Sequence, residues 1–79
     1  MERNKIFETI KQLIVDELQV DPEKVTIDAS FESDLGADSL DAIELVCELE
    51  NTFGLSISDE EAMDLKTVRQ IVDYVEAHE

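Results

Sequence analysis

The chain has few basic side chains, few aromatic side chains, no tryptophan and one cysteine. Its six Lys and Arg stand against 21 Asp and Glu, so the formal net charge at pH 7 is −15. Binding to nucleic-acid phosphates or to anionic membranes needs a basic face, which this composition excludes. No apolar run reaches the roughly 18 residues that a membrane-spanning helix requires. The single cysteine, Cys47, cannot form an internal disulfide, which is typical of a reducing compartment.

The length of the chain allows one small domain, which we expect to span residues 1–79. Its apolar share of 43% is sufficient for a modest core. The N-terminal segment leads into an amphipathic stretch that contains acidic residues, so it resembles neither a signal peptide nor a transit peptide. These features together predict a soluble, cytoplasmic, single-domain protein.

The acidic residues are concentrated in one part of the chain. Between Lys24 and Lys66 there is no Lys or Arg, while the same window contains twelve Asp and Glu. Such a cluster of like charges destabilises a small domain by repulsion. It therefore favours basic partners that are attracted from solution, although acidity that serves only solubility would give the same composition.

Apolar residues at helical spacing predict three substantial helices and one short one. The first covers roughly residues 4–18 and the second about 39–53. Asp21-Pro22-Glu23 predicts a short helical turn. Ser58 to Glu61 and Thr67 to Gln70 each have the form of a capping box, which predicts a short helix and then a last helix. The fold class is therefore all-α, a small four-helix bundle with a long ordered first loop over residues 19–38.

The helix predicted for residues 39–53 has two apolar stripes. A core stripe is expected from the residues that share one arc: Ala42, Leu45, Val46, Leu49 and Phe53. A second arc contains Leu40, Ile43 and Cys47 and is bordered by acidic residues. Because acidic residues border it, we expect the second stripe to be exposed to a partner.

Catalytic and metal-binding chemistry is poorly supported. The only histidine, His78, lies next to the last residue, where disorder is the usual state. Cys47 lies in an acidic helix, which does not favour a thiolate, so it is a poor nucleophile. The Cys and His ligands are too few for a zinc site, and the acids after Asp34 do not have EF-hand spacing. We therefore expect no enzyme, no catalytic residue and no metal ligand.

The segment Gly36-Ala37-Asp38-Ser39-Leu40 precedes the second helix. Its simplest interpretation is an ordinary helix start, with Asp38 or Ser39 as the N-cap. The pair Asp38 and Asp41 makes Asp38 the better cap, which would leave the Ser39 hydroxyl free at the first helical position. A phosphate attached there would be stabilised by the helix N-terminus.

The run from Asp34 to Asp41, followed by Ile43-Glu44-Leu45-Val46, resembles the carrier-site signature of bacterial acyl carrier proteins. The similarity extends over nearly the whole chain, including Asp28-Ala29-Ser30-Phe31 and Ser58-Asp59-Glu60-Glu61-Ala62. The resemblance implies that Ser39 carries 4′-phosphopantetheine, transferred from coenzyme A by a separate holo-acyl-carrier-protein synthase. The arm would then hold acyl chains as thioesters and carry them between enzymes of fatty acid biosynthesis.

The resemblance also implies a docking surface and a site for the cargo. Basic patches on partner enzymes would meet acidic residues of the second helix, namely Asp38, Asp41, Glu44 and Glu50. Leu40, Ile43 and Cys47 would give apolar contact. The acyl chain would be sheltered by Phe31, Val46, Leu49, Ile57, Ala62 and Leu65, which an ordinary core would also contain. The protein is expected to act as a monomer.

Two positions differ from the commonest family pattern. Cys47 stands where Met is frequent, which bears on partner preference. Ser58 stands where Pro is frequent, which changes only a helix start.

Two other functions fit the sequence. Carriers for polyketide, non-ribosomal peptide or D-alanyl transfer share the fold and the serine. An acidic protein-interaction module without a prosthetic group would use Ser39 only as part of a helix start.

Overall fold

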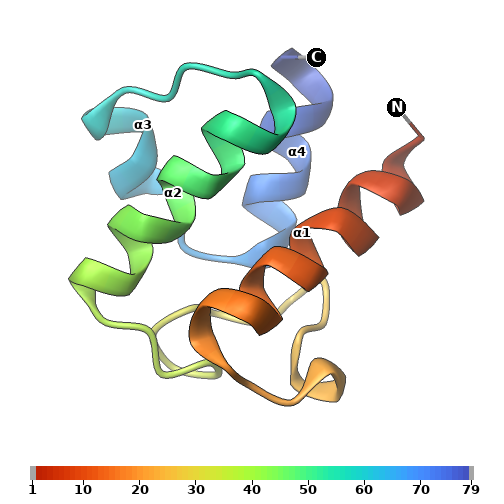
Figure 1. Ribbon diagram of the computed structural model, residues 1–79, viewed down its shortest axis with the longest axis vertical. Coiled ribbons are helices and arrows are strands. Elements are labelled where there is room, and N and C mark those ends of the chain that lie inside the picture. The colour runs from red at the N-terminus through yellow and green to blue at the C-terminus, as the bar shows by residue number, and fades with distance from the viewer. Residues whose placement is uncertain (1, 79) are drawn as a thin grey trace.

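The computed structural model describes residues 2–78, and this part of the chain is helical. In chain order the elements are α1 (Arg3–Leu18), a 3₁₀ turn η1 (Pro22–Lys24), α2 (Ser39–Phe53), α3 (Asp59–Asp64) and α4 (Val68–His78). Figure 1 shows α1, α2 and α4 as the three longer helices and α3 as a short one beside α2. Within residues 2–78 the only β pairing is an isolated bridge between Ser30 and Thr67. The predicted all-α bundle with a long first loop is confirmed.

Side-chain caps determine where the helices begin. Before α2, the Asp41 amide donates to Asp38 Oδ1 at 2.9 Å and the Asp38 amide donates to Asp41 Oδ2 at 3.2 Å. Ser58 and Glu61 form the same reciprocal pair before α3. Each pair satisfies amides that the first helical turn leaves without an intrahelical acceptor. Before α4, the Gln70 amide donates to Thr67 Oγ1 at 3.2 Å and the Thr67 amide donates to Gln70 Oε1 at 3.1 Å. The predicted capping boxes at Ser58 and Thr67 are therefore confirmed, and a third lies at the start of α2.

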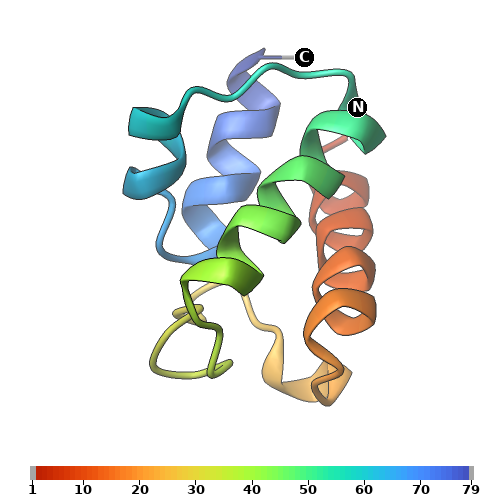
Figure 2. The same cartoon turned by 60° about the vertical axis from the view of Figure 1, so that its left-hand side comes forward.

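The core lies between α1, α2 and α4, which surround it in Figure 2. Helix α1 contributes Ile6, Ile10 and Ile14, all fully buried. Helix α4 buries Val68, Ile71, Val72 and Val75, as their spacing predicts. From α2 only Leu45 and Leu49 are buried. The placement of Ala42 in the core is wrong: it is exposed, because the start of α2 faces an open groove instead of another helix.

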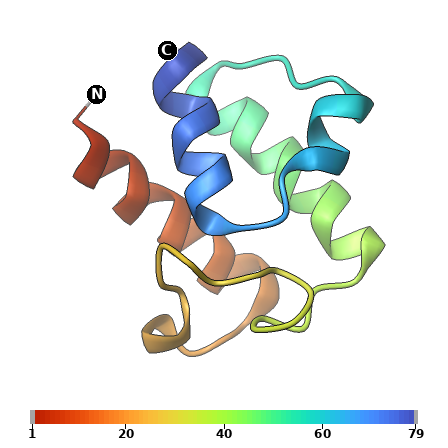
Figure 3. The ribbon, with the colours of Figure 1, turned by 180° about the vertical axis from the view of Figure 1, so that it is seen from behind.

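The long first loop is fastened to the start of α4. The amide of Phe31 donates to the Lys66 carbonyl at 3.1 Å, and the amide of Val68 donates to the Ala29 carbonyl at 3.0 Å. Arg69 adds an ion pair from its Nη2 to Asp28 Oδ1 at 2.6 Å. Figure 3 shows the loop running past the start of α4. Because these contacts join distant parts of the chain, the loop before α2 is held in one position.

Acidic side chains also face one another where α1 packs against α2. The pKa of Glu17 is raised above its ordinary value. The largest cause is a hydrogen bond with the Glu44 carboxyl, followed by burial and then by repulsion from Glu44, Glu48 and Asp41. A carboxyl whose pKa is raised in the folded state stabilises the fold only when protonated. This contribution is present at low pH and is lost as the pH rises through the raised pKa.

We therefore expect Glu17→Gln to raise the melting temperature at pH 7, where repulsion by the Glu17 carboxylate is removed. The gain should shrink as the pH falls below the usual carboxyl range, because both proteins are then neutral at this position. Thermal unfolding followed by circular dichroism between pH 3.5 and pH 7.5, at about 0.1 M salt, measures the difference. Glu8→Gln, on an exposed part of α1, is the matched control. A melting temperature that is equal or lower at pH 7 would contradict the assignment.

Candidate attachment site and groove

Ser39 is the first residue of α2, and its backbone position follows from the two residues before it. Gly36 adopts a left-handed conformation with φ of 66°, which turns the chain toward the helix at a conformation that other residues rarely adopt. Asp38 then takes the N-cap position with an extended backbone. Because Asp38 accepts the capping hydrogen bond, Ser39 is not needed for it. The sequence-based choice of Asp38 as the cap is confirmed.

The Ser39 side chain is exposed. Among residues 2–78, no partner for its hydroxyl is found within hydrogen-bonding distance. The hydroxyl sits at the positive end of the α2 dipole, where a phosphate ester is favoured. A free hydroxyl at this position fits the attachment of a phosphate-linked prosthetic group.

A groove of about 1030 Å³ opens beside Ser39, between the first loop, α2 and α3. Its walls include Ser39 itself and five residues expected to shelter an acyl chain: Phe31, Val46, Ile57, Ala62 and Leu65. The sixth, Leu49, does not line the groove, because it is fully buried in the core behind it. The groove is lined by both apolar and polar side chains, and Ser39 lies at its wall.

The second apolar stripe of α2 is exposed, as expected. Leu40 is 62% exposed and Ile43 is 61% exposed, and Cys47 is a free, exposed thiol. On α3, Met63 is 76% exposed and lies on the rim of the same groove, which the sequence pattern did not single out. Ile43, Cys47 and Met63 line this groove, and Leu40 does not. Exposed apolar side chains gathered in this way are typical of a contact surface.

The four carboxylates expected to meet partners do not have the same surroundings. Asp38 and Asp41 bind each other's backbone amides in the capping box. Glu44 is exposed and faces Glu17 of α1. Glu50 is half-buried, and its Oε2 accepts a hydrogen bond from the Ile57 amide at 3.1 Å. The structure therefore separates Glu50 from the other three. Spacing along the helix places Glu50 on the other flank of the second stripe but does not reveal its bond to the Ile57 amide.

Polar contacts join α3 to α4 at the far end of the groove. The Tyr74 hydroxyl donates to the Ser56 carbonyl at 3.4 Å. The Tyr74 hydroxyl also lies beside Glu61. The pKa of Glu61 is lowered, first by a hydrogen bond with Tyr74 and then by bonds from the Ser58 hydroxyl and amide. Desolvation, followed by this hydrogen bond, raises the pKa of Tyr74. Sequence reasoning did not identify Tyr74, because a tyrosine in an amphipathic helix carries no signal of its own.

The disorder expected at His78 is wrong. His78 is the last residue of α4; its ring stacks on the Tyr74 ring at 4.0 Å between centroids, and its Nδ1 lies 2.8 Å from the Tyr74 carbonyl oxygen. This histidine therefore packs on its own helix, at the opposite end of α4 from the first loop that leads to Ser39.

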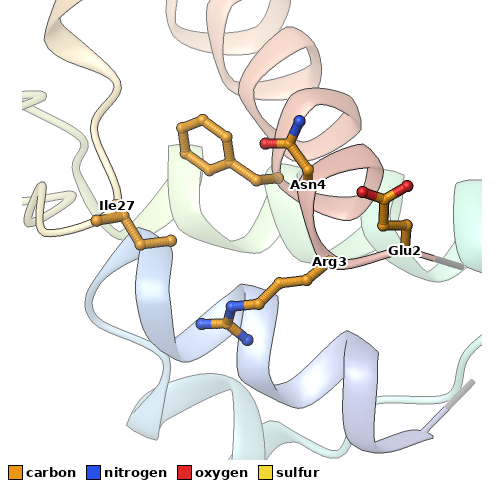
Figure 4. Close-up of a pocket in the computed structure, with 5 residues that line it drawn as sticks. Glu2, Arg3, Asn4 and Ile27 are labelled. Carbon is orange, nitrogen blue, oxygen red and sulfur yellow. The ribbon is translucent and has the colours of Figure 1, made fainter.

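A second, smaller hollow of about 450 Å³ lies at the start of α1. Figure 4 shows Glu2, Arg3, Asn4 and Ile27 around it. Arg3 is occupied by ion pairs to Asp73 at 2.8 Å and Glu76 at 3.3 Å. The hollow holds no thiol, hydroxyl or imidazole, so it offers no nucleophile.

Two kinds of feature are absent from residues 2–78. No three His, Cys, Asp or Glu side chains come together there as a candidate metal site. No helix in that range has the length and apolar character to cross a membrane.

Comparison with known proteins agrees with the geometry. A family model described as a phosphopantetheine attachment site matches residues 8–75. The chain is 51% identical over 75 residues to the acyl carrier protein of Thermosynechococcus vestitus, covering 95% of this chain and 93% of that protein. It is 49% identical over 79 residues to the acyl carrier protein of Rubrobacter xylanophilus, covering 100% and 98%. With this degree of identity over almost its full length, the chain belongs to the acyl carrier protein family, whose members bear 4′-phosphopantetheine.

Proposed function

We propose that the protein carries acyl chains for fatty acid biosynthesis as thioesters on a 4′-phosphopantetheine arm attached to Ser39. The observation that carries this proposal is the exposed Ser39 hydroxyl at the start of α2, beside an apolar groove. The groove lets a chain bound to the arm leave water, which favours burial by about 0.8 kcal/mol for each CH₂ group. The arm supplies the thiol that forms the thioester, and the protein supplies attachment, shelter and recognition.

The protein is not expected to modify itself. A serine hydroxyl is a weak nucleophile unless a base removes its proton. Around Ser39 the groove offers carboxylates but no imidazole, and His78 packs on Tyr74. A separate holo-acyl-carrier-protein synthase must therefore supply the base and the coenzyme A. The protein would itself catalyse no reaction.

Partner enzymes are proposed to recognise α2. Asp38, Asp41 and Glu44 would attract Arg and Lys, and Leu40, Ile43 and Cys47 would give apolar contact. Electrostatic attraction of this kind speeds association and weakens with salt. It suits a carrier that must leave each enzyme after delivery. We place this activity in a single domain over residues 1–79 that acts as a cytoplasmic monomer, in keeping with its single cysteine.

The test is the intact mass of the protein after incubation with coenzyme A and a bacterial holo-synthase. We expect the gain of one phosphopantetheinyl group, which fragmentation of the peptide containing residues 34–45 should locate on Ser39. Incubation of the product with enzymes that load fatty acyl, polyketide, aminoacyl or D-alanyl groups then separates the carrier classes. Absence of any gain in mass would favour an acidic interaction module without a prosthetic group.

A further inference from the structure

Glu50 makes a contact that the other acidic residues of α2 do not make. Its Oε2 accepts a hydrogen bond from the backbone amide of Ile57, seven residues later, at 3.1 Å. The bond is partly buried, and Glu50 itself lines the groove beside Ser39. Hydrogen bonds to ionised acceptors are stronger than neutral ones, and partial exclusion of water strengthens them further. Glu50 therefore ties the end of α2 to the segment that leads into α3.

The segment from Gly54 to Lys66, which contains α3, has little apolar anchorage. Ile57 is its only buried residue, 8% exposed, and α3 itself buries none. Leu55, Ala62 and Leu65 are only partly buried against the core. Because so little apolar area holds the segment, its polar contacts contribute a large share of what fixes its position.

At the ends of the segment, the Leu55 amide donates to the Glu50 carbonyl, and Lys66 bonds to Phe31 and Gln70. Between these ends, two side-chain contacts join it to the rest of the fold. One is the bond from the Ile57 amide to Glu50, at the single buried residue. The other is Tyr74 of α4, whose hydroxyl lies 3.4 Å from the Ser56 carbonyl and beside Glu61. The bond to Glu50 is shorter and involves a carboxylate. It also lies at the groove wall, which Ile57, Ala62 and Val46 all line.

We propose that Glu50 is a positioning residue: its carboxylate holds the Ile57 amide and thereby sets the distance of the α3 wall from α2. This inference rests on the proposed function in one respect only, the use of the groove for an acyl chain. Glu50 then differs from Glu44, which is exposed and lies beside Glu17 of α1 instead of holding a backbone amide. The role requires an acceptor oxygen at this position and does not require its negative charge.

A positioning role for Glu50 and a role in attracting a basic partner make different predictions for one pair of variants. Glu50→Gln keeps an acceptor oxygen and loses the charge, whereas Glu50→Ala loses both. If Glu50 positions the wall, Glu50→Gln keeps the bond to the Ile57 amide that Glu50→Ala loses. If Glu50 served only to attract a basic partner, Gln and Ala would be equally defective. Glu48→Gln and Glu48→Ala, on an exposed residue of the same helix, form the matched control pair.

The decisive measurement is hydrogen exchange of single amides by NMR on the unmodified protein at pH 7. In Glu50→Ala we expect the Ile57 amide to exchange about tenfold faster, with smaller increases in α3, because a bond to a charged acceptor is lost. In Glu50→Gln exchange should stay within about threefold of the original protein. The amides of Ile10 and Ile14 in α1, and both Glu48 variants, should be unchanged.

Unchanged Ile57 exchange in Glu50→Ala would overturn the proposal. So would equal acceleration in the Gln and Ala variants, since the charge and not the acceptor would then matter. Equal acceleration in α1 would mean a global loss of stability, which would also overturn it. None of these results depends on the prosthetic group, so they stand even if Ser39 is never modified.

A second measurement addresses the cargo. With an octanoyl group loaded on the arm, hydroxylamine should cleave the thioester about fivefold faster in Glu50→Ala than in Glu50→Gln, because a displaced wall shelters the chain less. Equal cleavage in both variants would contradict the positioning role at the groove.

Discussion

A Ser39→Ala variant incubated with coenzyme A and a bacterial holo-synthase should gain no mass, whereas the original protein should gain one phosphopantetheinyl group. The loss should be complete, because the ester oxygen itself is removed. No neighbouring hydroxyl replaces it: Ser30 accepts a hydrogen bond from the Ser33 amide, and Ser58 caps α3. Intact-mass spectrometry after prolonged incubation measures the result.

The fold of the Ser39→Ala protein should be unaffected, which makes the variant a clean test. Asp38, and not Ser39, accepts the capping hydrogen bond of α2, so the change should move the melting temperature by no more than about 3 °C. Ser33→Ala, on an exposed serine of the same groove, is the control and should be loaded normally. A mass gain that survives Ser39→Ala would move the attachment site elsewhere.

An Ile43→Asp variant should be loaded by the holo-synthase with a kcat/KM about thirtyfold lower than that of the original protein. Ile43 is 61% exposed and lies one helical turn from Leu40, so its side chain is available to a partner. A carboxylate placed in a partner's apolar pocket would lose its water without gaining a counter-ion. Rates of loading at several carrier concentrations, at about 0.1 M salt, give the value.

The same substitution tells docking apart from folding. Ile43 lies outside the core, so the melting temperature of Ile43→Asp should remain close to the original. Ala77→Asp adds the same charge to an exposed position near the end of α4 and should leave loading unchanged. If both variants were slowed equally, added charge would explain the effect. If neither were slowed, partners would not use this stripe of α2.

The sequence was most informative where a single residue, or a pair of residues close together in the chain, decides the local structure. Asp38 with Asp41, and Ser58 with Glu61, are short-range pairs whose hydrogen bonds depend on residues three apart, so they predicted the helix starts directly. Gly54 likewise ends α2 in the left-handed conformation that glycine favours. Each of these features is local, and each can therefore be predicted without knowledge of tertiary contacts.

Features that depend on distant parts of the chain could not be predicted in this way. Ala42 and Leu49 share an arc of α2, yet one faces an open groove and the other the core, because α3 covers α2 only in part. Helical periodicity gives the direction of a side chain but not what lies opposite. The family resemblance grouped Glu50 with Glu44 as partner-binding residues, although of the two only Glu50 reaches a backbone amide beyond its own helix.

The attachment of the first loop to the start of α4 has a consequence during synthesis on the ribosome. The loop that presents Ser39 is hydrogen-bonded to Lys66, Val68 and Arg69, which are translated some thirty residues after it. A nascent chain that still lacks these residues has no partner to hold the loop in place. An enzyme that reads the folded surface around Ser39 therefore needs a nascent chain from which Lys66 to Arg69 have already emerged.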